Sequence, residues 1–225
     1  MDTSAGACSA ALWEDAIIFE RTKEMQRGHA EALLPMILSV MRDADRRFTD
    51  LDLVAVTVGP GAFTGLRVGL AAARGIALAA GLPCFGVTTL EAIAEAIDWP
   101  TLARCPALVA LDNKQGGVYA QKFQAGRPVE PPSVHTARTL GGRYAGVRAA
   151  VAGDGSPMLI DALRGAGSYV GKITEIAVPP YPTASRVAAI AARRWLAGER
   201  PSAPPAPLYL RPPTTGPRPA RAGAG

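Results

Sequence analysis

The sequence predicts an α/β protein built from two related halves. Apolar runs typical of strands alternate with segments whose apolar residues recur at helical spacing. An order of hairpin, strand, glycine-rich turn and helix then occurs twice, which indicates an internal duplication. We expect a first half over residues 1–102, a second over 103–200 whose last helix can pack back on the first half, and a proline- and arginine-rich tail over 201–225.

The first half is expected to begin with a hairpin, because Ala7–Trp13 and Ala16–Glu20 are apolar runs separated by a two-residue turn. Apolar residues at spacings of three and four over 30–44 predict the next helix. Pro35 lies inside that pattern, so the helix starts near it or kinks there. The run Leu53–Val58 is apolar enough to be a strand buried on both faces.

A glycine-rich turn follows this strand and leads into a helix expected over Thr64–Ala80, with Thr64 as its N-cap. Glycine permits close backbone approach, and the free N–H groups of a helix N-terminus suit a phosphate. The turn has neither a Lys-Ser/Thr pair nor a complete GxGxxG pattern, so a phosphate site and a purely structural turn are both open. Beyond it we expect a strand over Cys84–Val87 and a threonine-capped helix that ends near Ile97.

The second half is expected to repeat this order of elements. Its strands are predicted over Ala107–Asp112, Gly117–Phe123 and Ala149–Ala152, the last running into Gly153-Asp154-Gly155, and its helices over a short segment ending near Arg164 and over Ala184–Leu196.

The helix after the first glycine turn carries small residues at every fourth position: Gly65, Gly69, Ala73 and Ala77. Such a stripe lets a second helix approach closely. The second helix is either the one that follows His29 in the same chain or a helix of another subunit. If the second helix belongs to another subunit, we expect a bulky residue at Gly69 or Ala73 to abolish the pairing of the subunits and to leave the fold intact.

Charge and cysteine content favour a reduced, cytoplasmic protein without a membrane partner. Most of the net charge of +5 belongs to the tail, because Glu199 is the last acidic residue and four arginines follow it. Such a tail is more typical of a disordered end than of a nucleic-acid arm. The three cysteines are widely spaced, and neither a signal segment nor an apolar run long enough to span a bilayer is predicted.

The motifs resemble the TsaB family of tRNA-modification proteins. The resemblance is densest over residues 59–69 (GPGAFTGLRVG) and continues at 86–90 (GVTTL). It is supported by residues 2–4 (DTS), by His29 with residues 33–35 (LLP), by 117–120 (GVYA) and by 207–211 (PLYLR), so it spans nearly the whole chain.

The resemblance implies two duplicated ribonuclease-H-like halves of the actin-like ATPase, sugar kinase and Hsp70 type. It also implies a non-catalytic subunit that pairs, through a helical bundle, with a TsaD-type transferase. That transferase places a threonylcarbamoyl group on the adenosine beside the tRNA anticodon, and a TsaE-type ATPase joins the complex. The chain would then reach tRNA through the complex and would need no catalytic residue, metal or cofactor of its own.

Carried over by matching positions, the bundle would use two helices of the first half. The residues so assigned are Leu33, Leu34, Ile37, Met41, Thr64, Gly65, Leu66, Arg67, Gly69, Leu70, Ala73 and Arg74. The exposed apolar face of such a bundle also favours a homodimer when the chain is alone. Asp2 and Asp112 match positions where nucleotide-binding relatives hold metal-handling aspartates, so they are the candidates for a vestigial nucleotide site.

Two other classes stay open: an ATP-binding phosphotransferase or hydrolase of the same superfamily, and a peptidase. Against a peptidase, His29 and His135 lie far apart in sequence without metal-ligand spacing, and no Gly-x-Ser-x-Gly nucleophile motif occurs. Against nucleotide binding, the glycine cluster at 153–155 is short and the second half is too small for a full adenine pocket. The turn at residues 112–116 (DNKQG) also departs from the family, in which an arginine and an acidic residue are more usual.

The chain departs from the family most clearly at Met1. Family members begin with an apolar strand that leads into Asp-Thr-Ser, whereas Met1 here precedes Asp2 directly. Either the start lies upstream or the first strand is absent. We expect a chain that begins at Met1 to have reduced stability, because the missing strand would occupy the centre of a sheet.

Overall fold

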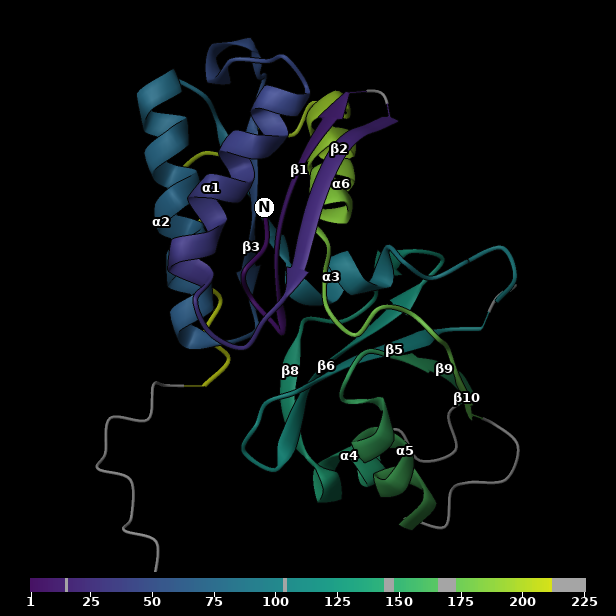
Figure 1. Cartoon of the computed structure of the whole chain (residues 1–225). Helices are drawn as coiled ribbons and strands as arrows, with labels where there is room; N and C mark the ends of the chain where they lie inside the picture. Colours follow the sequence, from purple (N-terminus) through teal and green to yellow (C-terminus); the bar gives the residue numbers. More distant parts are fainter. Residues whose placement is uncertain (15, 103–104, 144–147, 166–172, 212–225) are drawn as a thin grey trace, which may run out of the picture.

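The chain folds into two α/β halves that lie one above the other in Figure 1. The computed structural model describes residues 1–14, 16–102, 105–143, 148–165 and 173–211. Two helices join the halves: α3 (Thr89–Ala94) lies between their sheets, and α6 (Ala184–Leu196) returns from the second half to pack on the first.

The first half contains two separate two-stranded sheets. β1 (Ala7–Glu14) pairs antiparallel with β2 (Ala16–Glu24), and β3 (Val54–Gly59) pairs parallel with β4 (Cys84–Thr88). Three helical elements complete this half: α1 (His29–Asp43), the 3-10 turn η1 (Phe48–Asp50) and α2 (Phe63–Ala80).

Met1 and Asp2 lie between these two sheets and bond to both. Asp2 and Ser9 of β1 exchange two backbone hydrogen bonds of 2.9 Å as an antiparallel bridge. The Met1 amine donates to the Ala55 carbonyl at 2.8 Å, and the Thr57 amide donates to the Met1 carbonyl at 3.3 Å. This second pattern is that of a parallel pairing with β3.

The second half has one mixed sheet, with strand order β10-β9-β5-β6-β7 and with β8 also beside β6. Its strands are β5 (Ala107–Asp112), β6 (Gly117–Gln124), β7 (Arg127–Pro128), β8 (Ser133–Thr136), β9 (Ala149–Ala152) and β10 (Ile173–Glu175), and its helices are α4 (Ala137–Arg143) and α5 (Ser156–Gly165). β5 pairs antiparallel with β6 and parallel with β9.

Helices cover both faces of the first-half strands. α1 and α2 lie on one face and α6 on the other (Figure 1). Leu33, Ile37 and Val40 of α1 are buried against β1 on the first face, and Val187 and Ile190 of α6 are buried against β3 and β4 on the second. Strands covered on both faces are apolar throughout, which explains the continuous apolar run that predicts β3.

One core runs from the first half into the second. Leu90 and Ile93 of α3 pack with Val109, Leu111 and Phe123 of the second sheet, and all five are buried. Two ion pairs join α6 to α3: Arg193 pairs with Glu95, and Arg194 pairs with Glu91.

Most predicted elements agree with the structure to within a few residues. β5, β9 and α6 have the predicted bounds, whereas β2 extends four residues further. α1 starts at His29 and includes Pro35, so a start near Pro35 is wrong. α3 ends at Ala94 rather than near Ile97, and its cap is a reciprocal capping box between Thr88 and Glu91.

Candidate functional site

Asp2 is buried at the start of the chain, and one oxygen of its carboxylate accepts hydrogen bonds from Ser4 and from Thr57 of β3. Its Oδ1 accepts from the Ser4 amide at 3.0 Å, the Ser4 hydroxyl at 2.6 Å and the Thr57 hydroxyl at 2.5 Å. Its Oδ2 is buried without a partner among the described residues. Burial raises the pKa of Asp2, and the bonds from Ser4 and Thr57 offset only part of that rise. The carboxyl group therefore serves the fold of the turn and faces no solvent.

The glycine-rich turn lets residues 2–4 approach the start of α2 closely. A Cβ atom would lie 2.3 Å from the Ser4 carbonyl oxygen at Gly61, and 2.0 Å from the Thr3 carbonyl oxygen at Gly65. The Thr3 hydroxyl donates to the Gly65 carbonyl at 2.7 Å, and the Ala62 amide donates to the Ser4 carbonyl at 2.8 Å. Of the two interpretations left open by the sequence, the geometry supports the structural turn.

The N-terminus of α2 differs from the prediction in its cap. The helix begins at Phe63, its N-cap is Ala62, and no side chain caps it. Thr64 lies in the first turn of the helix and is exposed, so its assignment as N-cap is wrong.

A strap formed by residues 205–211 covers the outer side of this helix end. The Leu208 amide donates to the Val58 carbonyl at 2.7 Å, and the ring of Tyr209 lies 5.1 Å from that of Phe63. Arg67 stacks over Phe63 at 3.7 Å and donates to the Tyr209 hydroxyl at 3.2 Å. The strap therefore packs against the first turn of α2 through Phe63 and Arg67.

The strap also engages the second arginine of α2 and reaches the second half. Two nitrogens of Arg74 donate to the Pro205 carbonyl at 3.0 and 2.6 Å, and Arg211 donates to the Gln115 side chain at 3.1 Å. A Cβ atom at Gly86 would lie 3.0 Å from Pro205. Gly86 of the GVTTL motif thus lies against Pro205, two residues before the PLYLR motif.

The small-residue stripe of α2 faces the interior of the same chain. Gly65, Gly69, Ala73 and Ala77 are all buried, together with Leu66 and Leu70. A Cβ atom at Gly69 would lie 2.5 Å from the Thr3 hydroxyl and 3.4 Å from Val56. The close neighbours are thus residue 3 and β3 rather than a second helix. The expectation that a bulky residue at Gly69 leaves the fold intact is wrong for this reason.

The outer face of α1 and α2 has a different set of residues. Leu34 and Leu38 of α1 are 49 % and 50 % exposed, and Leu78 of α2 is 86 % exposed. Ala71 and Gly75 are exposed on the turns between the arginines and Leu78. We call these five residues the outer apolar face. The assigned bundle set lacks four of these five residues: Leu38, Ala71, Gly75 and Leu78. The i, i+4 spacing of Leu38 from Leu34 is a signal in the sequence that places Leu38 on the same face of the helix.

The assigned bundle residues divide by burial. Leu33, Ile37, Met41, Gly65, Leu66, Gly69, Leu70 and Ala73 are buried within the chain, whereas Leu34, Thr64, Arg67 and Arg74 are exposed. The structure brings the two helices side by side, since Val68, Ala72 and Ile76 of α2 join the core formed by α1 and β1. The surface available to a partner therefore combines the exposed four with the outer apolar face.

By length and composition alone, α2 is also apolar enough to cross a membrane, as one helix among the described residues. One such helix is weak evidence. Its buried residues pack on β3, as those of a core-flanking helix do.

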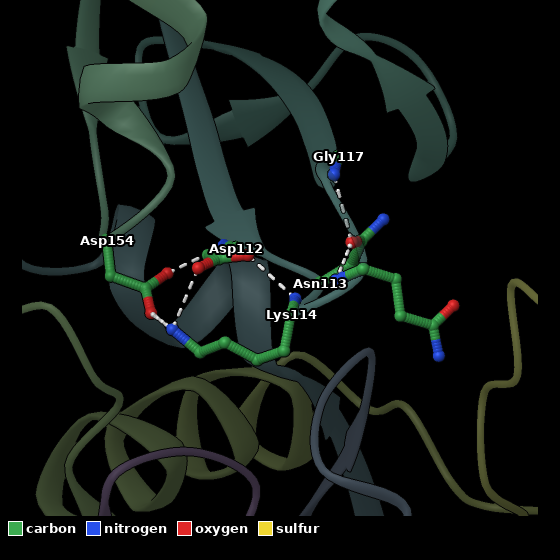
Figure 2. Close-up of polar contacts among 6 residues, drawn as sticks. Asp112, Asn113, Lys114, Gly117 and Asp154 are labelled. Atoms are coloured by element: carbon green, nitrogen blue, oxygen red, sulfur yellow. Dashed lines mark hydrogen bonds and ion pairs between the residues drawn. The ribbon is translucent and has the colours of Figure 1, made fainter. Parts of the chain in front are cut away.

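The second aspartate lies at the end of β5, in a turn that pairs it with a lysine (Figure 2). Lys114 Nζ lies 3.0 Å from Asp112 Oδ2 and 3.3 Å from Asp154 Oδ2. The Asp112 amide donates to Asp154 Oδ1 at 2.8 Å, and Asn113 Oδ1 accepts from the Gly117 amide at 3.1 Å. Burial alone would raise the pKa of Asp112, but the amide and ammonium of Lys114 outweigh it and lower that pKa.

The hollow beside this turn has a volume of about 540 Å³ and is acidic. Asp112, Asp154 and Asp161 line it, and Lys114 pairs with the first two. Gly153 and Gly155 permit the turn to pass against β5, because Cβ atoms there would lie 2.2 Å from the Ala110 oxygen and 2.9 Å from the Leu111 carbonyl carbon. Asp2 and Asp112, the two candidates for a vestigial nucleotide site, thus stand in unlike surroundings, one sealed and one paired with an ammonium.

A metal site does not fit the side chains that the structure describes. Among these residues, no three His, Cys, Asp or Glu side chains gather as a metal would require. His29 lies at the start of α1, and His135 lies on β8 with its Nε2 2.8 Å from the Ser133 hydroxyl. Burial lowers the pKa of His135.

Comparison with known proteins places these features in context. Residues 20–150 match the TsaD family model, described as tRNA N6-adenosine threonylcarbamoyltransferase. A tRNA threonylcarbamoyladenosine biosynthesis protein TsaB of Escherichia coli is 36 % identical over 124 residues, which are 55 % of this chain and 53 % of that protein. The chain thus spans about half the length of this curated relative.

Two further relatives match almost the whole chain. An uncharacterised protein of Mycobacterium tuberculosis is 34 % identical over 220 residues, which are 96 % of this chain and 92 % of that one. The solved structure of YeaZ from Pseudomonas aeruginosa superposes with a TM-score of 0.78 at 25 % identity, over 93 % of this chain and 97 % of that one. The fold of two duplicated halves is therefore shared with a solved structure.

Proposed function

The chain belongs to the family that the TsaD model describes and, within it, to the TsaB proteins, and from this we propose that it is a non-catalytic scaffold subunit. It pairs with a TsaD-type transferase in the threonylcarbamoyl modification of the adenosine beside the tRNA anticodon. A TsaE-type ATPase joins this complex in the cytoplasm, and the chain reaches tRNA through it.

The observation that carries the proposal is the outer apolar face of α1 and α2. Three leucines, Leu34, Leu38 and Leu78, are about half or more exposed on adjacent helices. Exposed apolar side chains grouped on two neighbouring helices of a folded protein mark a contact surface. The small residues Ala71 and Gly75 between them would let the backbone of a partner helix approach. Arg67 and Arg74 flank this face, and both are held by the strap.

The chemistry of the two aspartate turns supports a scaffold over an ATP-dependent phosphotransferase or hydrolase. A triphosphate would meet three carboxylates in the hollow beside Asp112, and the one ammonium there is already paired with two of them. At the other turn, Asp2 is sealed behind Ser4 and Thr57.

The proposal is tested by co-purification with a TsaD-type subunit and by threonylcarbamoyladenosine formation on tRNA in vitro. The pure chain is expected to form no product alone and to restore modification when it is added to the TsaD-type and TsaE-type subunits. Leu38→Glu is expected to reduce both co-purification and product about tenfold or more, because it places a charge within a desolvated contact.

Val129→Glu is the matched control. Val129 is 53 % exposed on the second half, away from α1 and α2, so the variant adds the same charge at a similar exposure. It is expected to behave as the unchanged chain does. Retained co-purification of Leu38→Glu would contradict the assigned face. Release of phosphate from ATP by the pure chain, abolished by Asp112→Asn, would favour the enzyme alternative instead.

The same face would also support a homodimer in the absence of the TsaD-type subunit. Under this proposal, Leu38→Glu elutes as a monomer in size-exclusion chromatography, whereas the unchanged chain and Val129→Glu elute alike as dimers at high concentration.

A further inference from the structure

The outer apolar face is bordered by arginines whose charge is not neutralised within the described part of the chain. Arg42 follows Leu38 by one helical turn on α1, and Arg67 and Arg74 lie two turns apart on α2. All three are exposed, and none forms an ion pair with a carboxylate that the structure describes. They therefore bring positive charge to the face that the proposed function assigns to a partner.

Carboxylates on the same two helices do not offset this charge. α2 contains no Asp or Glu, and α1 contains only Glu31 and Asp43. Asp43 is already paired with Arg21 of β2 at 2.6 Å, so Glu31 is the carboxylate that remains. The strap adds none, because the last acidic residue of the chain precedes it. The outer apolar face is therefore surrounded by an excess of positive charge.

The strap fixes the two arginines of α2 through uncharged groups. Arg67 donates from Nε to the Tyr209 hydroxyl at 3.2 Å and stacks over the Phe63 ring at 3.7 Å. Arg74 donates twice to the Pro205 carbonyl, at 3.0 and 2.6 Å. A hydroxyl and a carbonyl restrict a guanidinium group but leave its charge uncompensated. The two charges are thus held in place before a partner arrives, which lowers the entropy lost when each pairs with a carboxylate.

This charge distinguishes a second copy of the chain from a different partner. In a symmetric homodimer the same face meets itself, so the three arginines of one copy would approach those of the other, with Glu31 of each copy to offset them. Like charges brought together in a contact oppose association. Carboxylates of a different partner would pair with the guanidinium groups, and a charge that enters a desolvated contact needs such a partner.

We propose that Arg67 and Arg74 make the outer apolar face select a partner helix that carries an apolar stripe and two carboxylates seven residues apart, in preference to a second copy of this chain. The inference rests on the proposed function and specifies the chemistry of its partner. Residues seven apart lie about 10 Å apart on one side of a helix, so two such carboxylates match the spacing of Arg67 and Arg74. The leucines supply the apolar contact, and the arginines set the register of the partner helix.

The test measures the Kd of the full chain for a TsaD-type subunit in about 0.1 M NaCl, where charges act over about 10 Å. The double variant Arg67→Gln, Arg74→Gln is expected to raise the Kd about tenfold or more, because it removes both charges and keeps side-chain amides that can donate to the strap. The double variant Arg67→Lys, Arg74→Lys restores both charges and is expected to stay within about threefold of the unchanged chain. Hydrogen exchange of the Leu208 amide reports whether the strap stays in place in each variant.

Arg127→Gln, Arg138→Gln is the matched control. Both arginines are exposed on the second half, so this variant loses the same net charge away from α1 and α2. It is expected to bind the TsaD-type subunit as the unchanged chain does. A loss equal to that of the Arg67→Gln, Arg74→Gln variant would mean that net charge, and not its place on the outer apolar face, governs binding.

The homodimer of the chain alone is expected to respond in the opposite direction. In about 0.1 M NaCl, the Arg67→Gln, Arg74→Gln variant should dimerise about threefold or more tightly than the unchanged chain, as measured by sedimentation equilibrium. In about 1 M NaCl, where charges act over about 3 Å, the dimer of the unchanged chain should strengthen and its complex with the TsaD-type subunit should weaken. Salt acts on the leucine contacts with the same sign in both assemblies, so opposite responses report the charges.

Three outcomes would overturn the inference. The first is an equal Kd for the TsaD-type subunit in all variants. The second is a loss of affinity in the lysine variant as large as that in the glutamine variant. The third is a homodimer of the unchanged chain, in low salt, as tight as that of the glutamine variant. Failure of the unchanged chain to bind the TsaD-type subunit in either salt would instead contradict the proposed function itself.

Discussion

At the scale of single residues, Gly69 of α2 is a position where a Cβ atom has no room. A methyl group there would meet the Thr3 hydroxyl at 2.5 Å, so Gly69→Ala must displace this hydroxyl, which donates to the Gly65 carbonyl. We expect it to lower the free energy of unfolding by about 1–3 kcal/mol. Gly75→Ala, on the same helix with open space around its Cβ position, is expected to raise it by about 0.5–1 kcal/mol.

Urea denaturation of the two variants measures this difference directly. Both exchange glycine for alanine within one helix, so helix propensity is common to them and cancels in the comparison. Equal stabilities would mean that residues 2–4 do not contact α2 in solution.

In a chain whose first residue is Met1, the amine of that residue makes stability depend on pH. Met1 as a whole is partly exposed, but its amine lies inside, where burial lowers the amine pKa from 8.0 to about 6. The unfolded chain therefore binds more protons between these values, and stability rises as pH increases from about 6 to 8. The expected gain is up to about 2–3 kcal/mol.

N-terminal acetylation removes the titrating amine and keeps an N–H that can donate to Ala55. The acetylated chain is expected to lose this part of the pH dependence, as measured by denaturation at pH 6, 7 and 8. His135, whose pKa is also lowered by burial, contributes equally to both forms and cancels. An identical slope in the two forms would show that the amine is solvated.

At the scale of elements, a few hydrogen bonds hold the strap against α2 and β3. Arg74 donates twice to the Pro205 carbonyl, and the Leu208 amide donates to Val58 at 2.7 Å. Arg74→Ala is expected to speed hydrogen exchange of the Leu208 amide by about tenfold, because the strap opens more often. Arg42→Ala, at an exposed position of α1, is the control. Equal exchange in both variants would mean that Arg74 does not hold the strap.

At the scale of the whole molecule, the two halves are expected to unfold together. Leu90 and Ile93 of α3 belong to the core of the second sheet, while α6 packs on the strands of the first half. Trp99 packs against the core that contains Leu90 and Ile93, and Trp195 packs between α6 and the strands of the first half. Each tryptophan therefore reports on one half. Thermal unfolding of variants that carry Trp99 or Trp195 as their single tryptophan, with Trp13 also replaced, should give the same midpoint by fluorescence as by circular dichroism. Separate midpoints would reveal two independent domains.

Local patterns in the sequence were sufficient to predict most elements and the duplication. Apolar runs predict the bounds of β5 and β9, and the helical period predicts those of α6. These signals depend only on neighbours within a few residues. The motif of residues 59–69 also identifies the family, and comparison with known proteins confirms it.

What lies against each face was decided by the tertiary structure alone. The four-residue stripe of α2 predicts a close neighbour, but only the fold shows that this neighbour is Thr3 and β3. The pairing of Lys114 with Asp112 and Asp154, and the strap on Arg67 and Arg74, likewise join segments distant in sequence. Periodicity specifies which residues share a face. The identity of the group that covers this face depends on how the chain closes on itself, which no local pattern encodes.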